Sequence, residues 1–306
     1  MDNKCCAICV SYNPDYLVLR RVLAACAEQV GRVYVVDNGS REDVTSSFSG
    51  FANVEAILLG QNKGIAAAIN AAIRQARIDG FRFVLLLDQD SVIPKDMIPQ
   101  YLAAFEQLLV AGQSVAVIGP RYKDARTGQI SHFVRFKWFR NAYYSGTDGS
   151  LVVPIDFLIS SGSFYSIDIF EAVGMFDETL FIDHVDTEWC LRAASLGFQC
   201  FGIREVIMEH ALGEGGVRLW LFRWRTQPMH KPFRLYYIAR NSLLLYQMQH
   251  VPLKWVSGDV LRLVRLFLMY TFFSTQRFAA IRCYFCGIID GLRGVAGPRI
   301  SHRRCG

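Results

Sequence analysis

The first 120 residues alternate short apolar runs with longer stretches of helical periodicity. The apolar runs predict strands at residues 5–12, 32–38, 54–59, 81–90 and 114–119, and the stretches between them predict helices at 15–29, 64–78 and 94–112. Apolar runs without polar alternation are typical of parallel strands buried on both faces of a sheet. The pattern therefore predicts an α/β fold with a Rossmann-like, mostly parallel sheet flanked by helices.

After Pro120 the pattern changes. Residues 132–144 interleave aromatic and basic side chains, for which we favour an exposed hairpin with one packed face over a ligand-binding surface. Residues 155–170 predict another central strand, and a helix is expected to end near residue 196. No linker, low-complexity stretch or internal repeat separates these parts.

Arginines punctuate the apolar C-terminal segment 260–290. Arg262, Arg265, Arg277 and Arg282 leave no apolar run long enough to span a bilayer. Two interpretations stay open and are compatible with each other. The segment lies in a membrane interface with its arginines reaching the headgroups, or it forms amphipathic helices packed on the main domain.

The charge distribution also divides the chain. Residues 217–306 carry 15 Lys and Arg against two acidic residues, a net charge of +13, whereas the first 216 residues carry 18 basic and 25 acidic residues. A basic, aromatic-rich region could meet anionic lipid or nucleic acid. Its apolar content fits lipid better, so we expect an inner-membrane surface as partner and no nucleic acid.

The nine cysteines in 306 residues do not suggest a disulfide scaffold. Cys5, Cys6 and Cys9 lie in a predicted strand, where cysteine behaves as a small hydrophobic residue. Cys283 and Cys286 form a lone CxxC pair, which is weak support for zinc. A reducing cytoplasm fits this usage best. No signal peptide is expected, because the chain enters a strand within its first residues.

Polar residues follow four of the predicted strands. They are SYNP (11–14), DNGS (37–40), GQNKG (60–64) and DQDS (88–91). In parallel sheets ligands bind beyond the carboxyl ends of the strands, so these segments are expected to line a site. The first of them lacks the GxGxxG fingerprint, which argues against NAD. Asp88 and Asp90, two apart in extended backbone, can share a face and hold Mg²⁺ or Mn²⁺ with phosphate oxygens.

Several motifs together resemble family-2 inverting glycosyltransferases of the GT-A fold, and most of all the bacterial rhamnosyltransferases of O-antigen and other surface polysaccharide synthesis. The motifs run in the family order over most of the chain: VSYNP (10–14), VVDNGS (35–40), NKGIAAAIN (62–70), LLLDQDS (85–91), SSGS (160–163), GMFDETLFIDHVDTEWCLRA (174–193) and RLYYIARNSLLL (234–245).

The resemblance implies a set of donor-binding residues. Asp37 would accept a hydrogen bond from the pyrimidine base, and backbone groups of Ser11 and Tyr12 would hold the same ring. Asn62, Lys63 and Gly64 would start a helix near the donor, with Lys63 meeting phosphate. The competing interpretations are a plain turn at Asp37 and a helix start without a ligand at the second segment. In this scheme Asp88 contacts the sugar or ribose.

The resemblance also implies the catalytic group and the metal ligands. Asp186 aligns with the catalytic base, and it is expected in the first turn of a helix, where a carboxylate stays ionised at neutral pH. Asp90 and His210 are the expected ligands of the Mg²⁺ or Mn²⁺ ion. Asp183 is predicted to be a helix cap rather than an acceptor contact, and His184, His230 and His250 are assigned structural roles.

The resemblance implies transfer of L-rhamnose from dTDP-L-rhamnose to a lipid-linked glycan acceptor, as in lipopolysaccharide synthesis. The enzyme would be peripheral on the cytoplasmic face of the inner membrane. Alternatives are a galactofuranosyl- or hexosyltransferase that uses a UDP-sugar, and a nucleotide-sugar-binding protein without turnover. Residues 1–215 would form the catalytic core, with nucleotide binding in about 1–120 and acceptor binding in about 121–215. Residues 216–306 would form a basic helical region.

Overall fold

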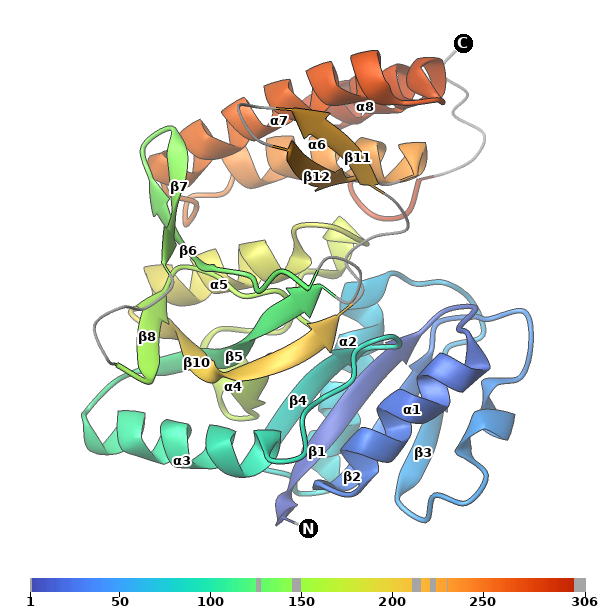
Figure 1. The fold of residues 1–306 in the computed structure, drawn as a ribbon, viewed down its shortest axis with the longest axis vertical. Coiled ribbons are helices and arrows are strands. Elements are labelled where there is room, and N and C mark those ends of the chain that lie inside the picture. Colours follow the sequence, from blue (N-terminus) through green and yellow to red (C-terminus); the bar gives the residue numbers. More distant parts are fainter. Residues whose placement is uncertain are drawn as a thin grey trace.

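An eight-stranded sheet forms the centre of the computed structural model, which describes residues 2–124, 128–144, 150–210, 216–220, 224–229 and 231–299. The strand order is β3-β2-β1-β4-β9-β5-β10-β8 (Figure 1). Four strands of the first half run parallel, namely β1 (Asp2–Ser11), β2 (Val30–Asp37), β3 (Val54–Leu58) and β4 (Phe83–Asp88). The prediction of a mostly parallel α/β sheet is confirmed.

The second half of the sheet mixes directions. Strands β5 (Val115–Asp124) and β10 (Gln199–His210) are parallel, while β8 (Val152–Ile155) and β9 (Phe164–Ser166) pair antiparallel with their neighbours. The predicted long central strand at 155–170 is therefore wrong, because only three of its residues, in β9, lie at the sheet centre. Gly162 has a φ of +76°, which interrupts extended backbone just before β9.

Helices cover both faces of the sheet. On one face lie α1 (Tyr16–Ala27) and α3 (Met97–Val110), and on the other α2 (Ile65–Ile78), α4 (Ile169–Ala172) and α5 (Val185–Ser195). Each layer buries its apolar side chains against the sheet, which accounts for the two large cores. Two short 3₁₀ turns, η1 (Val44–Phe48) and η2 (Glu178–Leu180), belong to the connecting loops.

The interleaved aromatic and basic segment forms the predicted hairpin of β6 (Phe133–Lys137) and β7 (Arg140–Tyr144). Phe133 and Phe136 are buried against the core, while Trp138 and Tyr143 are exposed. Phe133 and Phe136 are three positions apart in β6, an odd spacing, so simple two-residue alternation does not account for the burial of both side chains.

The C-terminal region begins with a second hairpin, β11 (Gly216–Trp220) and β12 (Trp224–Pro228), so the expectation of an entirely helical region is wrong at its start. Three helices follow: α6 (Pro232–Tyr246), α7 (Leu253–Phe273) and α8 (Arg277–Leu292). They lie together at one end of the molecule (Figure 1). Gly287 and Gly291 let α8 approach α6 closely, since an added Cβ would lie 2.3 Å and 2.7 Å from carbonyl oxygens of that helix. No described helix combines the length and the apolar character needed to cross a bilayer.

Candidate active site

The polar ends of three neighbouring strands meet at one edge of the sheet. In the parallel register Ser11 of β1 pairs with Asp37 of β2, and Val10 pairs with Asp88 of β4. The predicted donor-binding positions therefore lie side by side, as expected for the carboxyl edge of a parallel sheet.

The two predicted donor loops hold each other in place. The amide of Asn38 bonds to Asn62 at 3.2 Å, and the backbone N–H of Lys63 donates to the side-chain oxygen of Asn38 at 2.9 Å. Gly39 has a φ of +83°, and a Cβ there would lie 2.6 Å from the backbone of Gln61. This close approach requires glycine and fixes the turn after β2 against the loop that starts α2.

At the ends of β1 and β2, several of the predicted donor-binding groups already have protein partners. The buried carboxylate of Asp37 accepts the backbone N–H of Ser40 at 3.1 and 3.2 Å. The carbonyl of Ser11 accepts from Asn38, and the N–H of Tyr12 donates to the side chain of Gln89 at 2.8 Å. Sequence reasoning missed Gln89, whose only signal was its place between Asp88 and Asp90. The Tyr12 ring is exposed and remains open to a ligand.

The Ser160–Ser163 segment supports the carboxylates after β4. The backbone N–H of Asp88 donates to Ser161 Oγ at 3.1 Å, and this hydroxyl donates to Ser91 Oγ at 2.8 Å. The buried Tyr122 hydroxyl donates to the Ser161 carbonyl at 2.8 Å, and burial raises its pKa well above the usual value. These serines were recognised as a motif but had no predicted role.

Asp186 lies in the first turn of α5, as predicted. Its carboxylate accepts the N–H groups of Thr187 at 2.8 Å and Ser160 at 3.3 Å. Desolvation raises its pKa to about 6, opposed by these two hydrogen bonds and reinforced by the negative charges of Asp183 and Asp88. The group is therefore largely ionised at pH 7, close to the range in which a general base is most effective. The adjacent residues Ser160 and Ser161 bond to Asp186 and to the backbone of Asp88 respectively, so the two aspartates flank the same short segment.

The loop before α5 has unusual backbone geometry. Phe181, Asp183 and His184 all have φ near +64°, and the N–H of Ile182 donates to the Leu180 carbonyl at 2.8 Å across a tight γ-turn. Such conformations cost of order 1–3 kcal/mol each and persist where the surroundings hold them. The loop therefore needs support from outside itself.

Helix α6 supplies that support. The buried amide of Asn241 donates to the carbonyls of Leu180, Ile182 and Asp183 at 2.8–2.9 Å. Arg240, also buried, donates to the Leu180 carbonyl at 2.9 Å. Both residues belong to the RLYYIARNSLLL motif (234–245), which predicted none of these contacts.

Two side chains of the loop pair with the C-terminal helices. Asp183 forms a two-pronged ion pair with Arg234, at 2.5 and 3.2 Å, so the predicted helix-cap role is wrong. The N-cap position is instead His184, whose Nε2 lies 2.7 Å from Arg262 and 3.1 Å from Ser242. Burial, together with the Arg262 charge, lowers the pKa of His184 to about 4, so it is neutral at pH 7. Its structural role is confirmed.

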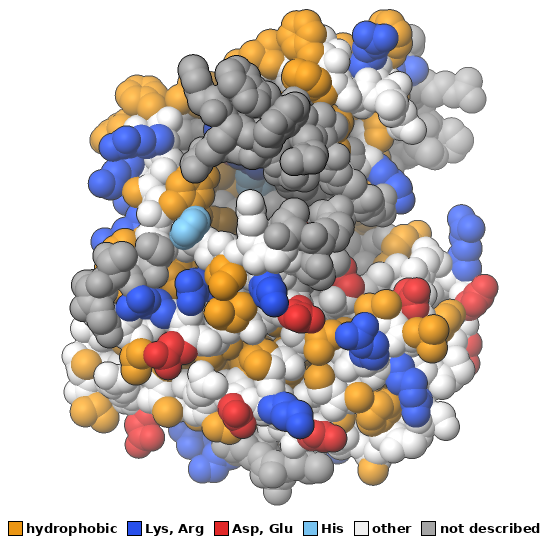
Figure 2. Space-filling view, viewed as in Figure 1, with side chains coloured by type: hydrophobic (Ala, Val, Ile, Leu, Met, Phe, Trp, Pro, Cys, Tyr) orange, Lys and Arg blue, Asp and Glu red, His pale blue; other side chains and the backbone are white. Residues whose placement is uncertain are grey.

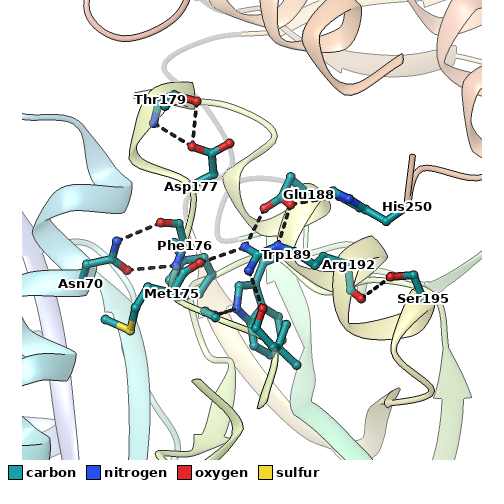
Figure 3. A network of polar contacts seen from close by, with 12 residues as sticks. Asn70, Met175, Phe176, Asp177, Thr179, Glu188, Trp189, Arg192, Ser195 and His250 are labelled. Atoms are coloured by element: carbon teal, nitrogen blue, oxygen red, sulfur yellow. Dashed lines mark hydrogen bonds and ion pairs between the residues drawn. The ribbon is translucent and has the colours of Figure 1, made fainter. Parts of the chain in front are cut away.

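The opposite side of α5 is anchored by a second network (Figure 3). Arg192 grips the buried Glu188 with two bonds of 2.8 and 2.9 Å and also donates to the Val173 and Met175 carbonyls. His250, after α6, meets Glu188 at 3.0 Å. Glu188 and Arg192 are four residues apart on α5, a spacing that places them on one face of the helix. A hollow of about 560 Å³ beside this network is lined by Met175, Asp177, Glu188, Arg192, Met248, Gln249 and His250.

Of the residues considered for the metal, Asp88 ends β4 and Asp90 lies in the turn that follows, and both are half-buried. The backbone of His210 ends β10, and its neighbour Glu209 bridges to Val92, so this position adjoins the Asp88–Asp90 turn. The side chain of His210 is outside the described part of the chain. Among the described side chains, no three metal-binding groups converge. Two carboxylates nevertheless fit Mg²⁺ or Mn²⁺, because such ions usually take a few protein oxygens plus substrate phosphates and water.

The mostly parallel sheet flanked by helices, with polar loops at the carboxyl ends of its strands, is consistent with the GT-A fold of glycosyltransferases. The chain belongs to glycosyl transferase family 2, whose model matches residues 6–174. It is 32% identical over 302 residues to the dTDP-rhamnosyl transferase RfbF of Shigella flexneri, covering 97% of this chain and 98% of that relative.

Solved structures agree on the fold. Staphylococcus aureus TarS 1-349 in complex with UDP-GlcNAc aligns with a TM-score of 0.54 at 14% identity, covering 95% of this chain and 81% of that one. GalNAc-T7 with UDP, GalNAc and Mn²⁺ aligns with a TM-score of 0.57 at 11% identity, covering 84% and 53% of the two chains. At these identities the likeness concerns the fold alone.

Proposed function

We propose that this glycosyltransferase moves L-rhamnose from dTDP-L-rhamnose to a hydroxyl of a lipid-linked glycan, inverting the anomeric centre, in synthesis of a surface polysaccharide such as O-antigen. The observation that carries the proposal is the shared site of Asp186 and Asp88, held by adjacent serines, in a chain similar over nearly its full length to a dTDP-rhamnosyl transferase.

The chemistry follows from the position of Asp186. As the acceptor oxygen attacks the anomeric carbon, Asp186 takes the hydroxyl proton while the bond from that carbon to the diphosphate oxygen breaks on the opposite face. The pKa of about 6 leaves the carboxylate ionised and still basic enough to accept the proton. A diphosphate leaves as an anion without a protein acid, so one carboxylate suffices for a single inverting displacement.

Donor binding would use the paired loops at the carboxyl edge. Asp37, Ser11 and Tyr12 lie at the base end, and Asn62, Lys63 and Gly64 lie at the start of α2, where an exposed Lys63 and a helix N-terminus favour phosphate. A divalent ion held by Asp90 and His210, with Asp88 towards the sugar or ribose, would neutralise charge on the leaving diphosphate.

We place the enzyme on the cytoplasmic face of the inner membrane. The support is the basic C-terminal region, with 15 Lys and Arg against two acidic residues after residue 216. An acceptor on a lipid carrier would be presented at that surface, so a basic region that binds anionic lipid would bring the enzyme to its acceptor.

The test is a calorimetric panel of dTDP-rhamnose, UDP-galactofuranose and a UDP-hexose, each with Mg²⁺ or Mn²⁺. We expect dTDP-rhamnose to bind at least about tenfold more tightly than the UDP-sugars, a difference of about 1.4 kcal/mol. Tighter binding of UDP-galactofuranose would contradict the proposed donor but would leave the assignment as a glycosyltransferase unchanged. Binding without dTDP release when a lipid-linked acceptor is added would favour a protein without turnover.

A further inference from the structure

The outer faces of α7 and α8 are apolar where solvent-exposed helices are usually polar. On α7 an exposed stripe recurs at helical spacing through Leu253, Leu261, Val264, Leu268 and Phe272. On α8 the matching stripe is Phe278, Phe285, Ile289 and Leu292. Phe272 is 70% exposed and Phe278 81%. The two helices pack against each other, and the ring centroids of Phe267 on α7 and Phe285 on α8 lie 5.5 Å apart.

On these two helices, exposed arginines lie on the outer side and the acidic residues face partners on the inner side. Arg265 and Arg282 are exposed within the stripes. The two acidic residues are held by internal partners: Asp259 bonds Arg262 and Tyr246, and Asp290 accepts from the Tyr236 hydroxyl. Among the described residues of α7 and α8, the outer face is thus apolar and basic. In Figure 2 the upper end of the molecule shows orange and blue side chains and no described red ones.

The β6–β7 hairpin extends this face from the catalytic core. The N–H of Phe139 donates to Ser257 Oγ of α7 at 3.0 Å, and Ser257 lies between Leu253 and Leu261 along the stripe. At the hairpin tip Trp138 is 60% exposed and Phe139 66%, flanked by exposed Lys137 and Arg140. Residues 129–144 contain no acidic side chain.

We propose that the two helix stripes and the hairpin tip form one docking face for an anionic lipid surface. Aromatic and aliphatic side chains interleaved with arginine and lysine suit the boundary between headgroups and acyl chains. A second copy of the chain is a poorer occupant, because two such faces would bring exposed arginines of like charge together. The inference deepens the proposed peripheral location by adding part of the catalytic core to the membrane contact.

The face also orients the active site. Helix α6 lies between the docking face and the loop that leads to Asp186, with α8 packed on one side of α6 and Asn241 holding the loop on the other. Binding by this face would therefore bring the acceptor side of the site towards the membrane, where a lipid-linked hydroxyl is presented.

The test is flotation of the full chain with vesicles of phosphatidylglycerol and phosphatidylethanolamine, compared with phosphatidylcholine alone. We expect wild-type protein to float with the anionic vesicles and to partition at least about tenfold less with the neutral ones, and high salt to weaken binding. The double variants Phe272→Ser with Phe278→Ser, and Trp138→Ser with Phe139→Ser, should each reduce partitioning by about tenfold or more.

The matched control is Leu17→Ser with Ile78→Ser, two side chains on α1 and α2 that are each 78% exposed. This control should float like the wild type. Floating of the hairpin variant at wild-type level, or equal partitioning into neutral vesicles, would overturn the proposal. A wild-type protein that forms dimers but does not bind vesicles would also overturn it, if the Phe272→Ser with Phe278→Ser variant is monomeric. Flotation needs neither donor nor acceptor, so its failure is distinct from failure of the proposed glycosyl transfer.

Discussion

The backbone N–H of Ser160 donates to the Oδ2 of Asp186 at 3.3 Å, while the next residue, Ser161, binds the backbone of Asp88 and the hydroxyl of Ser91. Two adjacent serines thus connect the proposed base to the proposed metal-binding turn. Gly162 allows this connection, because a Cβ there would lie 2.8 Å from Pro120. The segment fixes the distance between the groups that would act on the acceptor and on the leaving diphosphate.

Ser161→Ala removes the hydroxyl that accepts from Asp88 and donates to Ser91 inside the protein. We expect the free energy of unfolding to fall by about 1–3 kcal/mol, because the partly buried Asp88 N–H and the buried Ser91 hydroxyl lose this partner. Donor affinity in the presence of Mn²⁺ should fall as well, as measured by calorimetry beside urea unfolding. Ser46→Ala, whose exposed hydroxyl bonds Asp43, is the control and should change neither quantity. Unaltered metal-dependent donor binding would remove Ser161 from the site.

Asp186→Asn keeps the shape of the side chain and removes its basicity. Transfer should fall by about 10²–10⁴-fold while donor affinity stays near the wild-type value. Product formation and calorimetry on the same preparation measure the two quantities. Substantial residual turnover would mean that another group acts as the base.

The raised pKa of Asp186 makes two further pH-dependent predictions. Turnover of the wild type should fall as the pH drops below about 6, since the base becomes protonated. The folded protein binds this proton more tightly than the unfolded chain, so the carboxylate destabilises the fold above pH 6 and this penalty disappears as the pH falls to about 4. Asp186→Asn should therefore be more stable than wild type at pH 8, by up to about 3 kcal/mol. A less stable variant in urea unfolding at that pH would contradict the assigned pKa.

Gly64→Ala tests the contact between the NKG segment (62–64) and the loop before α5 (181–184). Gly64 has a φ of +89°, and a Cβ would lie 2.5 Å from the Phe181 carbonyl, which accepts the first N–H of α2 from Ile65. We expect a lower melting temperature together with weaker donor binding. Gly60→Ala is the matched control, because Gly60 also has a positive φ, +70°, but open space around it. Its smaller effect should reflect backbone strain of about 1 kcal/mol alone. Equal losses in both variants would show that the loop contact has no role in donor binding.

Asn241→Asp preserves the size of a buried side chain but removes the amide that donates to three backbone carbonyls of the loop before α5. We expect kcat to fall by about tenfold to a hundredfold with little change in the donor KM, because the loop places Asp186 rather than the nucleotide. The acidic limb of the plot of kcat against pH should also shift, because the surroundings of Asp186 change. A smaller amount of folded protein would lower kcat without shifting this limb. Gln247→Ala, at the end of the same helix, serves as the control. A normal kcat and pH profile in folded Asn241→Asp would exclude a positioning role.

Much of the fold follows from local pattern. The unbroken apolar runs predicted the parallel strands, and the helix at 65–78 begins beside the predicted NKG segment. The prediction failed at 155–170, because the apolar run hides a turn made possible by Gly162 and leaves only three residues in strand β9. It failed again at 216–228, where a hairpin replaces a helix. Short apolar segments do not distinguish these structures by periodicity.

The sequence by itself determined which residues are available for chemistry: the DQDS turn, the DNGS and NKG loops, and one carboxylate at the start of a helix. Only the tertiary structure decided their surroundings. Asp183, expected to cap the helix, pairs with Arg234 from a segment 51 residues away, and the left-handed loop depends on Asn241. The pKa of Asp186 near 6 likewise arises from desolvation and from Asp88, which is remote in the chain. Such effects depend on distances between segments, and a local sequence pattern does not contain them.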